Sequence, residues 1–164
     1  MKLPTAVLLV LAATTAFAAS DAQKSFDTIK ALRGTWEGKT SQGKDVEVSF
    51  RPTANDSAVL SEIHGGSHGP QQDMITMFHM DGPNFLMTHY CSIGNQPRMT
   101  ATMSPDGKTI TFNFLDATNL STPDAGHMQR VIFTMTDGNH HIEEWHFMDH
   151  GKEMVERFDL QKKS

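Results

Sequence analysis

Reactive and hydrogen-bonding side chains gather between residues 88 and 99, in the stretch THYCSIGNQPRM. Cys91, the only cysteine of the chain, stands two residues from His89, and a thiol beside an imidazole is a pairing that nucleophilic catalysis uses. Arg98, with His89 and Tyr90 nearby, offers donors that hold a carboxylate or an amide inside an apolar pocket. The stretch therefore predicts a ligand contact or, as the alternative, a polar turn on a structural rim.

Cysteine chemistry is the weaker interpretation of this stretch. A catalytic thiolate needs an electropositive setting and an oxyanion site, and no cysteine-hydrolase signature surrounds Cys91. Buried, unreactive cysteines are the commoner kind. If residues 84–91 form a strand, alternation places His89 and Cys91 on one face, and we expect His89 to point inward.

The segment 116–128, DATNLSTPDAGHM, is longer than a connection between neighbouring strands requires. Asp116 and Asn119 near its start, and His127 near its end, carry groups that either stabilise turns or contact a ligand. We expect the segment to form a gate over an opening, with these three side chains as candidate ligand contacts.

The nine histidines raise the question of a metal site. One strand seldom supplies every ligand of a tetrahedral site, and the methionines of residues 73–80 divide between two strand faces. We therefore predict no specific zinc or copper site. The side chains weighed for such a site are His64, His68, His140, Glu144, His146 and His150.

The elements that must position these side chains follow from periodicity and turn residues. Residues 21–33 repeat apolar side chains at roughly helical spacing before Gly34, which predicts a short amphipathic helix. Beyond Gly34 the chain shows short β-rich segments between turn pairs such as three Asp-Gly dipeptides. The predicted strands are 35–41, 44–51, 57–63, 73–80, 84–91, 97–104, 109–115, 129–136, 140–148 and 152–161.

This order of elements predicts an all-β fold, an antiparallel up-and-down β-barrel of about ten strands with a short N-terminal helix. Most of the predicted connections join sequential strands and are short, whereas a two-sheet sandwich needs longer crossovers. Closing the sheet removes its edges, and a barrel of eight or more strands can hold a small ligand.

The first 18 residues have the features of a secretory signal peptide, with Lys2, an apolar run over 7–13 and small residues around Phe17. The apolar run is too short for a membrane span. We predict one barrel domain over 19–164, exported to the periplasm or the extracellular space. The formal net charge of −5 without a basic run argues against a nucleic-acid partner.

The stretch LRGTWEGKTSQG resembles the start of barrels of the calycin superfamily, which includes lipocalins and fatty-acid-binding proteins. Their first strand carries a Gly-x-Trp motif, here Gly34 to Trp36, and the resemblance implies that Trp36 closes the barrel floor. The runs LMTHYCSIGNQPRM and LDATNL are similar to uncharacterised bacterial calycin-like proteins. The resemblance implies a fold but no particular activity.

The chain departs from the better-known calycins in two places. Residues 41–43 alone join the first two predicted strands, where fatty-acid-binding proteins carry a two-helix cap, and the sequence ends from a strand without the C-terminal helix of lipocalins. Ten strands with a short first turn are more similar to nitrobindin-like haem barrels. Haem is the cofactor which that similarity implies, but no motif indicates an axial histidine.

We therefore predict a binding protein for a small apolar or amphipathic ligand held in the barrel. Binding needs only a cavity, whereas an enzyme needs a proton-transfer pair close to its target. Two alternatives stay open: a haem barrel or small enzyme that uses His89 or His127, and a scaffold filled by Phe112, Phe114, Phe133 and methionines. The candidate ligand contacts are Trp36, His89, Tyr90, Arg98, Asp116, Asn119 and His127.

Overall fold

The computed structural model describes residues 19–66 and 74–164. The predicted signal peptide over 1–18 and the candidate metal ligand His68 lie outside the described residues.

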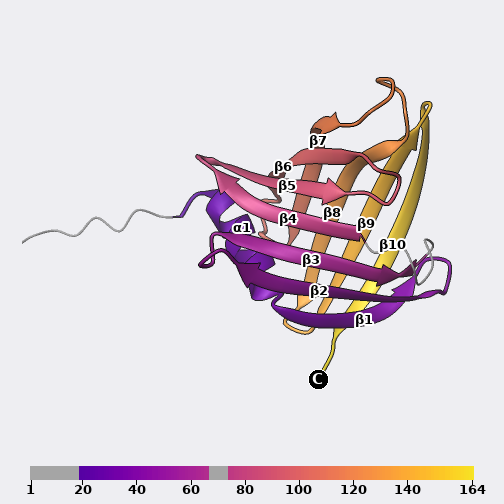
Figure 1. The fold of residues 1–164 in the computed structure, drawn as a ribbon. Coiled ribbons are helices and arrows are strands. Elements are labelled where there is room, and N and C mark those ends of the chain that lie inside the picture. Colours follow the sequence, from indigo (N-terminus) through magenta and orange to yellow (C-terminus); the bar gives the residue numbers. More distant parts are fainter. Residues whose placement is uncertain (1–18, 67–73) are drawn as a thin grey trace, which may run out of the picture.

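One helix and ten strands follow each other along the described chain, and the strands form a closed antiparallel barrel in sequential order (Figure 1). The predicted all-β fold with a short helix before the first strand is confirmed. The elements are α1 (Asp21–Ala31), β1 (Gly34–Thr40), β2 (Asp45–Thr53), β3 (Ala58–Gly65), β4 (Met74–Asp81), β5 (Asn84–Tyr90), β6 (Gln96–Met103), β7 (Thr109–Thr118), β8 (His127–Asp137), β9 (His140–Asp149) and β10 (Lys152–Lys162).

Pairing of the first strand with the last closes the barrel. Trp36 of β1 stands opposite Lys162 of β10, and the pairing continues to Thr40 opposite Phe158. Tight turns on glycine join the strands, as at Gly82 and Gly107, where φ is positive. Every strand therefore has a neighbour on both sides, and the sheet has no exposed edge.

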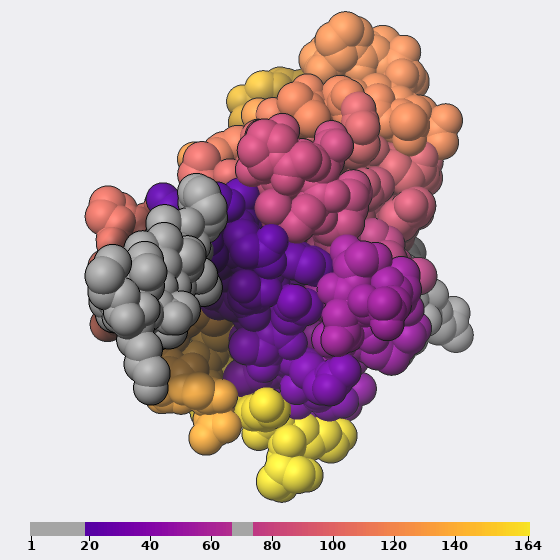
Figure 2. Space-filling view, turned by 90° about the vertical axis from the view of Figure 1, so that its left-hand side faces the viewer, coloured from indigo at the N-terminus to yellow at the C-terminus, as the bar shows by residue number. Residues whose placement is uncertain are grey.

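The helix α1 covers one end of the barrel. Ser20 caps it by accepting a hydrogen bond from the backbone N–H of Gln23 at 3.2 Å, and its apolar side chains Phe26 and Ile29 are buried. The helix lies against β2, β4, β5 and β6. In Figure 2, which looks toward this side of the molecule, the indigo residues of the helix region fill the centre between the surrounding strands.

Aromatic side chains fill the lumen beside α1. Ring contacts lead from Phe26 of the helix to Phe85 at 5.5 Å, then to Phe112 at 5.1 Å and on to Phe133 at 6.0 Å. Each of these rings is almost fully buried, which stabilises the fold by about 1.5–3 kcal/mol per side chain. The interior predicted for a filled scaffold is present at this end, although Phe114 is only partly buried.

The predicted loop over 116–128 is wrong in its length. β7 continues to Thr118 and β8 begins at His127, which leaves residues 119–126 as the connection. Sequence patterns missed these strand ends because most of the extra residues, Asp116, Thr118 and His127, are polar or of turn-forming types. Within the described residues, no helix has both the length and the hydropathy to cross a bilayer.

Candidate functional site

A pocket of about 310 Å³ opens at the end of the barrel away from α1. Its walls come from the turns after β1 and β5, the starts of β4, β8 and β10, and the second half of β9. Most of the lining is apolar, with sulfur and aromatic side chains prominent. The lining residues are Gln42, Met74, Cys91, Ile93, Met128, Trp145, Phe147, Met154, Val155, Glu156 and Phe158.

Trp145 separates this pocket from the filled part of the barrel. Its indole lies 5.0 Å from the imidazole of His89 and 6.5 Å from the ring of Phe133, measured between ring centroids. The indole N–H donates a hydrogen bond of 2.9 Å to the Glu143 carboxylate. With its N–H engaged and its ring packed between neighbours, Trp145 has a fixed orientation.

A buried polar network lies under Trp145. Glu143 and His141 have no exposed surface, and His141 Nε2 lies 3.0 Å from the second Glu143 oxygen. The His141 ring packs edge-on against Trp36 at 4.4 Å, while its Nδ1 is buried without a hydrogen-bond partner. Burying polar side chains is costly unless they form hydrogen bonds. The bonds among these residues therefore hold the floor of the pocket in place against the core.

Cys91 lies in the wall of the pocket rather than in a catalytic pairing. Burial raises the pKa of its thiol above the ordinary value, and hydrogen bonds from the backbone of Ile93 and Ser92 oppose the shift only in part. A raised pKa favours the thiol over the thiolate, which works against nucleophilic attack. His89, proposed as its base, lies 2.9 Å from the Thr76 hydroxyl through Nδ1.

Three of the predicted ligand contacts form a group on the outer surface. Arg98 holds the Asp116 carboxylate through two nitrogens, with Nε at 2.7 Å, and both side chains are about half exposed. Arg98 lowers the pKa of Asp116 through this hydrogen bond. The Asn119 amide donates to the Gln96 side chain at 3.0 Å. None of them lines the pocket. That they contact a ligand stays a prediction.

The other predicted contacts lie in different surroundings. Trp36 is buried beside α1, where its indole N–H donates to the Leu32 carbonyl at 2.7 Å, and Tyr90 points outward with 47% of its surface exposed. His89 is fully buried and points inward as expected. His127 packs against Phe114 at 4.5 Å. None of these residues lines the pocket.

The residues at the pocket do not fit haem ligated by histidine. Among the described residues, no histidine lines the pocket. The Trp145 ring covers His89, and the two ring nitrogens of His127 lie 2.7 Å from the Ala125 carbonyl and 2.9 Å from the Gln129 side chain. Both nitrogens of His127 therefore have partners within the protein, and His89 lies outside the pocket lining. No group of three or more His, Cys, Asp or Glu in the described chain has metal-binding geometry.

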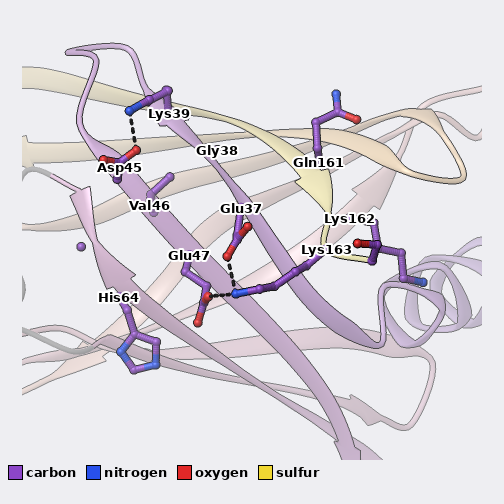
Figure 3. A pocket seen from close by; sticks show the side chains of 12 residues that line it. Glu37, Gly38, Lys39, Asp45, Val46, Glu47, His64, Gln161, Lys162 and Lys163 are labelled. Carbon is purple, nitrogen blue, oxygen red and sulfur yellow. Dashed lines mark hydrogen bonds and ion pairs between the residues drawn. The ribbon is translucent and has the colours of Figure 1, made fainter.

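A second concavity lies on the outer surface of β1, β2, β3 and β10 (Figure 3). The ammonium group of Lys163 lies between the carboxylates of Glu37 and Glu47, and Lys39 pairs with Asp45. Because these charges form ion pairs with each other, they are less available to bind a ligand. The apolar pocket is therefore the better candidate for a ligand site.

Comparison with known proteins gives no family. No family model matches the chain, and no curated protein matches it. Among solved structures, a de novo designed fluorescence-activating β-barrel is similar, with 13% sequence identity, a TM-score of 0.40, and coverage of 84% of this chain and 98% of that chain. A likeness this distant carries no argument about function, and the calycin resemblance stays a prediction.

Sequence reasoning missed most of the pocket. Alternation along residues 140–148 places Trp145 and Phe147 on the face opposite His146, but that pattern does not assign the face to a ligand pocket. His141 and Glu143 share that face and are buried in the structure, but two polar side chains gave the sequence no signal of an inner face. Met128, Met154 and Glu156 lie on β8 and β10, which pair with β9 on either side. Met74 and Cys91 come from β4 and the turn after β5, and only the closed barrel brings them to the same pocket.

Proposed function

We propose that this protein binds a small apolar or amphipathic molecule in the pocket at the open end of its barrel. The observation that carries the proposal is the pocket itself, with walls of methionine, aromatic and aliphatic side chains over a closed floor. Apolar walls with a few polar groups are typical of small-molecule sites, and methionine adapts to ligands of irregular shape.

The floor sets the size of the ligand. The pocket of about 310 Å³ is at the small end of the range in which proteins bind small molecules, about 300–1,000 Å³. Below it, Trp145 and the buried Phe133 occupy the lumen. The proposal therefore favours a compact ligand over a long acyl chain that would extend through the barrel.

Export and calycin membership form part of the proposal. Residues 1–18 have the pattern of a signal peptide, which supports a carrier that works in the periplasm or outside the cell. The Gly34 to Trp36 motif after a helix supports the calycin resemblance. A haem barrel is not favoured, because neither His89 nor His127 lines the pocket.

The test is a titration of the purified protein with N-phenyl-1-naphthylamine, a neutral dye that fluoresces in apolar surroundings. Two substitutions at one position separate pocket binding from surface binding. Cys91→Phe fills the pocket, and Cys91→Ser keeps the size of the side chain. We expect saturable binding to the natural protein and to Cys91→Ser, and affinity weaker by about tenfold or more in Cys91→Phe.

Met154→Trp is a second filling variant, at a half-exposed position on the rim where a larger side chain has room. Circular dichroism and thermal unfolding confirm that each variant is folded. No saturable dye binding to the natural protein, or unchanged affinity in both folded filling variants, contradicts the proposal.

A further inference from the structure

We infer that the ligand of the pocket carries an aromatic ring, and that Phe147 is the residue that selects it. The inference rests on the proposed function and adds the chemical class of the ligand. It follows from the exposure of Phe147, from its neighbours on the adjacent strands, and from the backbone that supports its ring.

Phe147 is an aromatic side chain that a ligand in the pocket can reach. Three aromatic residues of the described chain line the pocket, but Trp145 and Phe158 keep only 4% and 2% of their surface exposed. Their rings pack against each other at 6.4 Å and belong to the floor. Phe147 is partly buried and packs against the core from its edge. A ligand in the pocket therefore has the Phe147 ring as its aromatic contact.

The strand register places a methionine on each side of this ring. Phe147 stands opposite Met154 of β10 and opposite Met128 of β8, and all three residues line the pocket. Directly opposite residues of antiparallel strands share a face and have Cβ atoms about 4.5–5.5 Å apart. Met128 is nearly buried, whereas Met154 is about half exposed at the rim. A ligand that contacts Phe147 therefore also lies beside the accessible thioether of Met154.

The backbone before β8 supports the Phe147 ring from outside the pocket. A Cβ at Gly126 would lie 2.8 Å from Cζ of the ring, so the glycine backbone packs directly against it. The buried side chain of Asn95 donates a hydrogen bond of 2.7 Å to the Gly126 carbonyl. The ring is therefore held in place before a ligand arrives, and a preorganised contact loses less conformational freedom on binding.

An aromatic ligand gains contacts in this pocket that a saturated ligand lacks. Two aromatic rings attract each other in edge-to-face or offset arrangements, beyond the effect of the area that they bury. The sulfur of Met154 adds a favourable contact with the edge of a ligand ring. A saturated ring of the same outline buries a similar apolar area but makes neither contact. We therefore expect the pocket to prefer the aromatic molecule of such a pair.

The experiment is displacement of N-phenyl-1-naphthylamine by benzyl alcohol and by cyclohexylmethanol, which share a hydroxymethyl group and differ in the ring. Because the saturated ring leaves water more readily, each displacing concentration is corrected by the partition of that alcohol between water and octanol. We expect the corrected concentration to be lower by about fivefold for benzyl alcohol, which corresponds to about 1 kcal/mol. The ratio of the two concentrations does not depend on the affinity of the dye.

Phe147→Leu and Phe114→Leu make the matched pair of variants. Both replace a partly buried aromatic ring by an aliphatic side chain, but Phe114 lies on β7 outside the pocket lining. We expect Phe147→Leu to abolish the corrected preference and to retain displacement by cyclohexylmethanol, while Phe114→Leu keeps the preference. Phe147→Ile is a second replacement, because β-branched side chains suit strands. Circular dichroism checks that each variant is folded.

The failures of the two proposals differ in this experiment. If the dye binds to the natural protein but both alcohols displace it at equal corrected concentrations, the aromatic inference is wrong and the apolar pocket stands. A preference that is retained in a folded Phe147 variant, or lost equally in Phe114→Leu, also contradicts the inference. If the dye does not bind to the natural protein at all, the proposed function fails, and the inference fails with it.

Discussion

The imidazole of His89 and the indole of Trp145 meet across the lumen of the barrel, with their ring centroids 5.0 Å apart. His89 belongs to β5 and Trp145 to β9, and β6, β7 and β8 lie between these strands around the wall. A contact between such distant strands divides the interior. On one side lies the open pocket, and on the other the aromatic core that begins at α1.

Thr76→Val tests the support of this contact. The substitution keeps the shape of the side chain but removes the hydroxyl that lies 2.9 Å from His89 Nδ1 in the buried interior. Loss of one partner of a buried hydrogen bond lowers the free energy of unfolding by about 2 kcal/mol. Urea unfolding measures the change, and Thr102→Val, at an exposed position, is the control. Equal effects of the two substitutions would show that the bond to His89 is unimportant.

Substitutions of Glu143 test the network under the pocket. Glu143→Leu removes the acceptor of the Trp145 N–H and leaves His141 without its partner, so we expect the free energy of unfolding to fall by about 3 kcal/mol. Glu143→Gln keeps an oxygen for the indole and an amide that bonds the imidazole, so we expect a loss of about 1 kcal/mol. The difference between the variants in denaturant unfolding is the measurement. Equal losses would assign the effect to packing alone.

The reactivity of Cys91 reports on the pocket. Because burial raises the pKa of the thiol, less thiolate is present at pH 8 than in a free cysteine, and alkylation by iodoacetamide is slower. The rate increases as the pH rises toward the shifted pKa. A bound dye slows the reaction further, since Cys91 lines the pocket. Mass spectrometry follows the single thiol, and a rate that the dye does not change places the dye elsewhere.

The pair of Arg98 and Asp116 predicts a pH effect at the outer surface. Arg98 lowers the pKa of Asp116, so the pair stabilises the fold above the ordinary carboxyl value of about 3.9. This stabilisation is lost as the pH falls through the folded-state value. We expect Arg98→Ala to return the Asp116 titration, followed by NMR, toward the ordinary value. Because the pair lies outside the pocket, affinity for the neutral dye stays the same.

Gly38→Ala tests the close approach of β1 and β10. A Cβ at Gly38 would lie 1.8 Å from the carbonyl oxygen of Asp159, which is backbone and cannot move aside. We expect the free energy of unfolding to fall by about 3 kcal/mol. Gly138→Ala is the control, because a Cβ there meets nothing within 4 Å. Thermal unfolding compares the two, and a loss that is no greater in Gly38→Ala would contradict the strand geometry.

The strands could be predicted from the sequence because their signals are local. Alternation and the Asp-Gly turns act over a few residues, so the ten strands agree with prediction to within a few positions. Which face of a strand points into the barrel is harder to predict, since both faces of β5 contain apolar residues. Alternation placed His89 on one face of the strand but did not show whether that face points into the barrel. The burial of His89 shows that it does.

The candidate site depends on contacts that no local pattern contains. Tyr90 and Arg98 were predicted as ligand contacts because of their hydrogen-bonding groups, yet both side chains point outward. Glu156 and Trp145 are far from THYCSIGNQPRM in the sequence, and they meet Cys91 only where strand ends converge around the open end. A ligand pocket in a barrel is a property of closure, so single-strand patterns cannot locate it.

Closure between β1 and β10 also constrains how the chain folds. The last strand completes the ring by pairing with the first, and Ser41 and Arg157 join their backbones across 116 positions. Until β10 arrives, β1 and β9 both present unpaired edges, and β10 of another molecule can occupy that gap. Shortening the turn between β9 and β10 should therefore favour strand-exchanged assemblies, in which the intact last strand of one molecule completes the barrel of its neighbour.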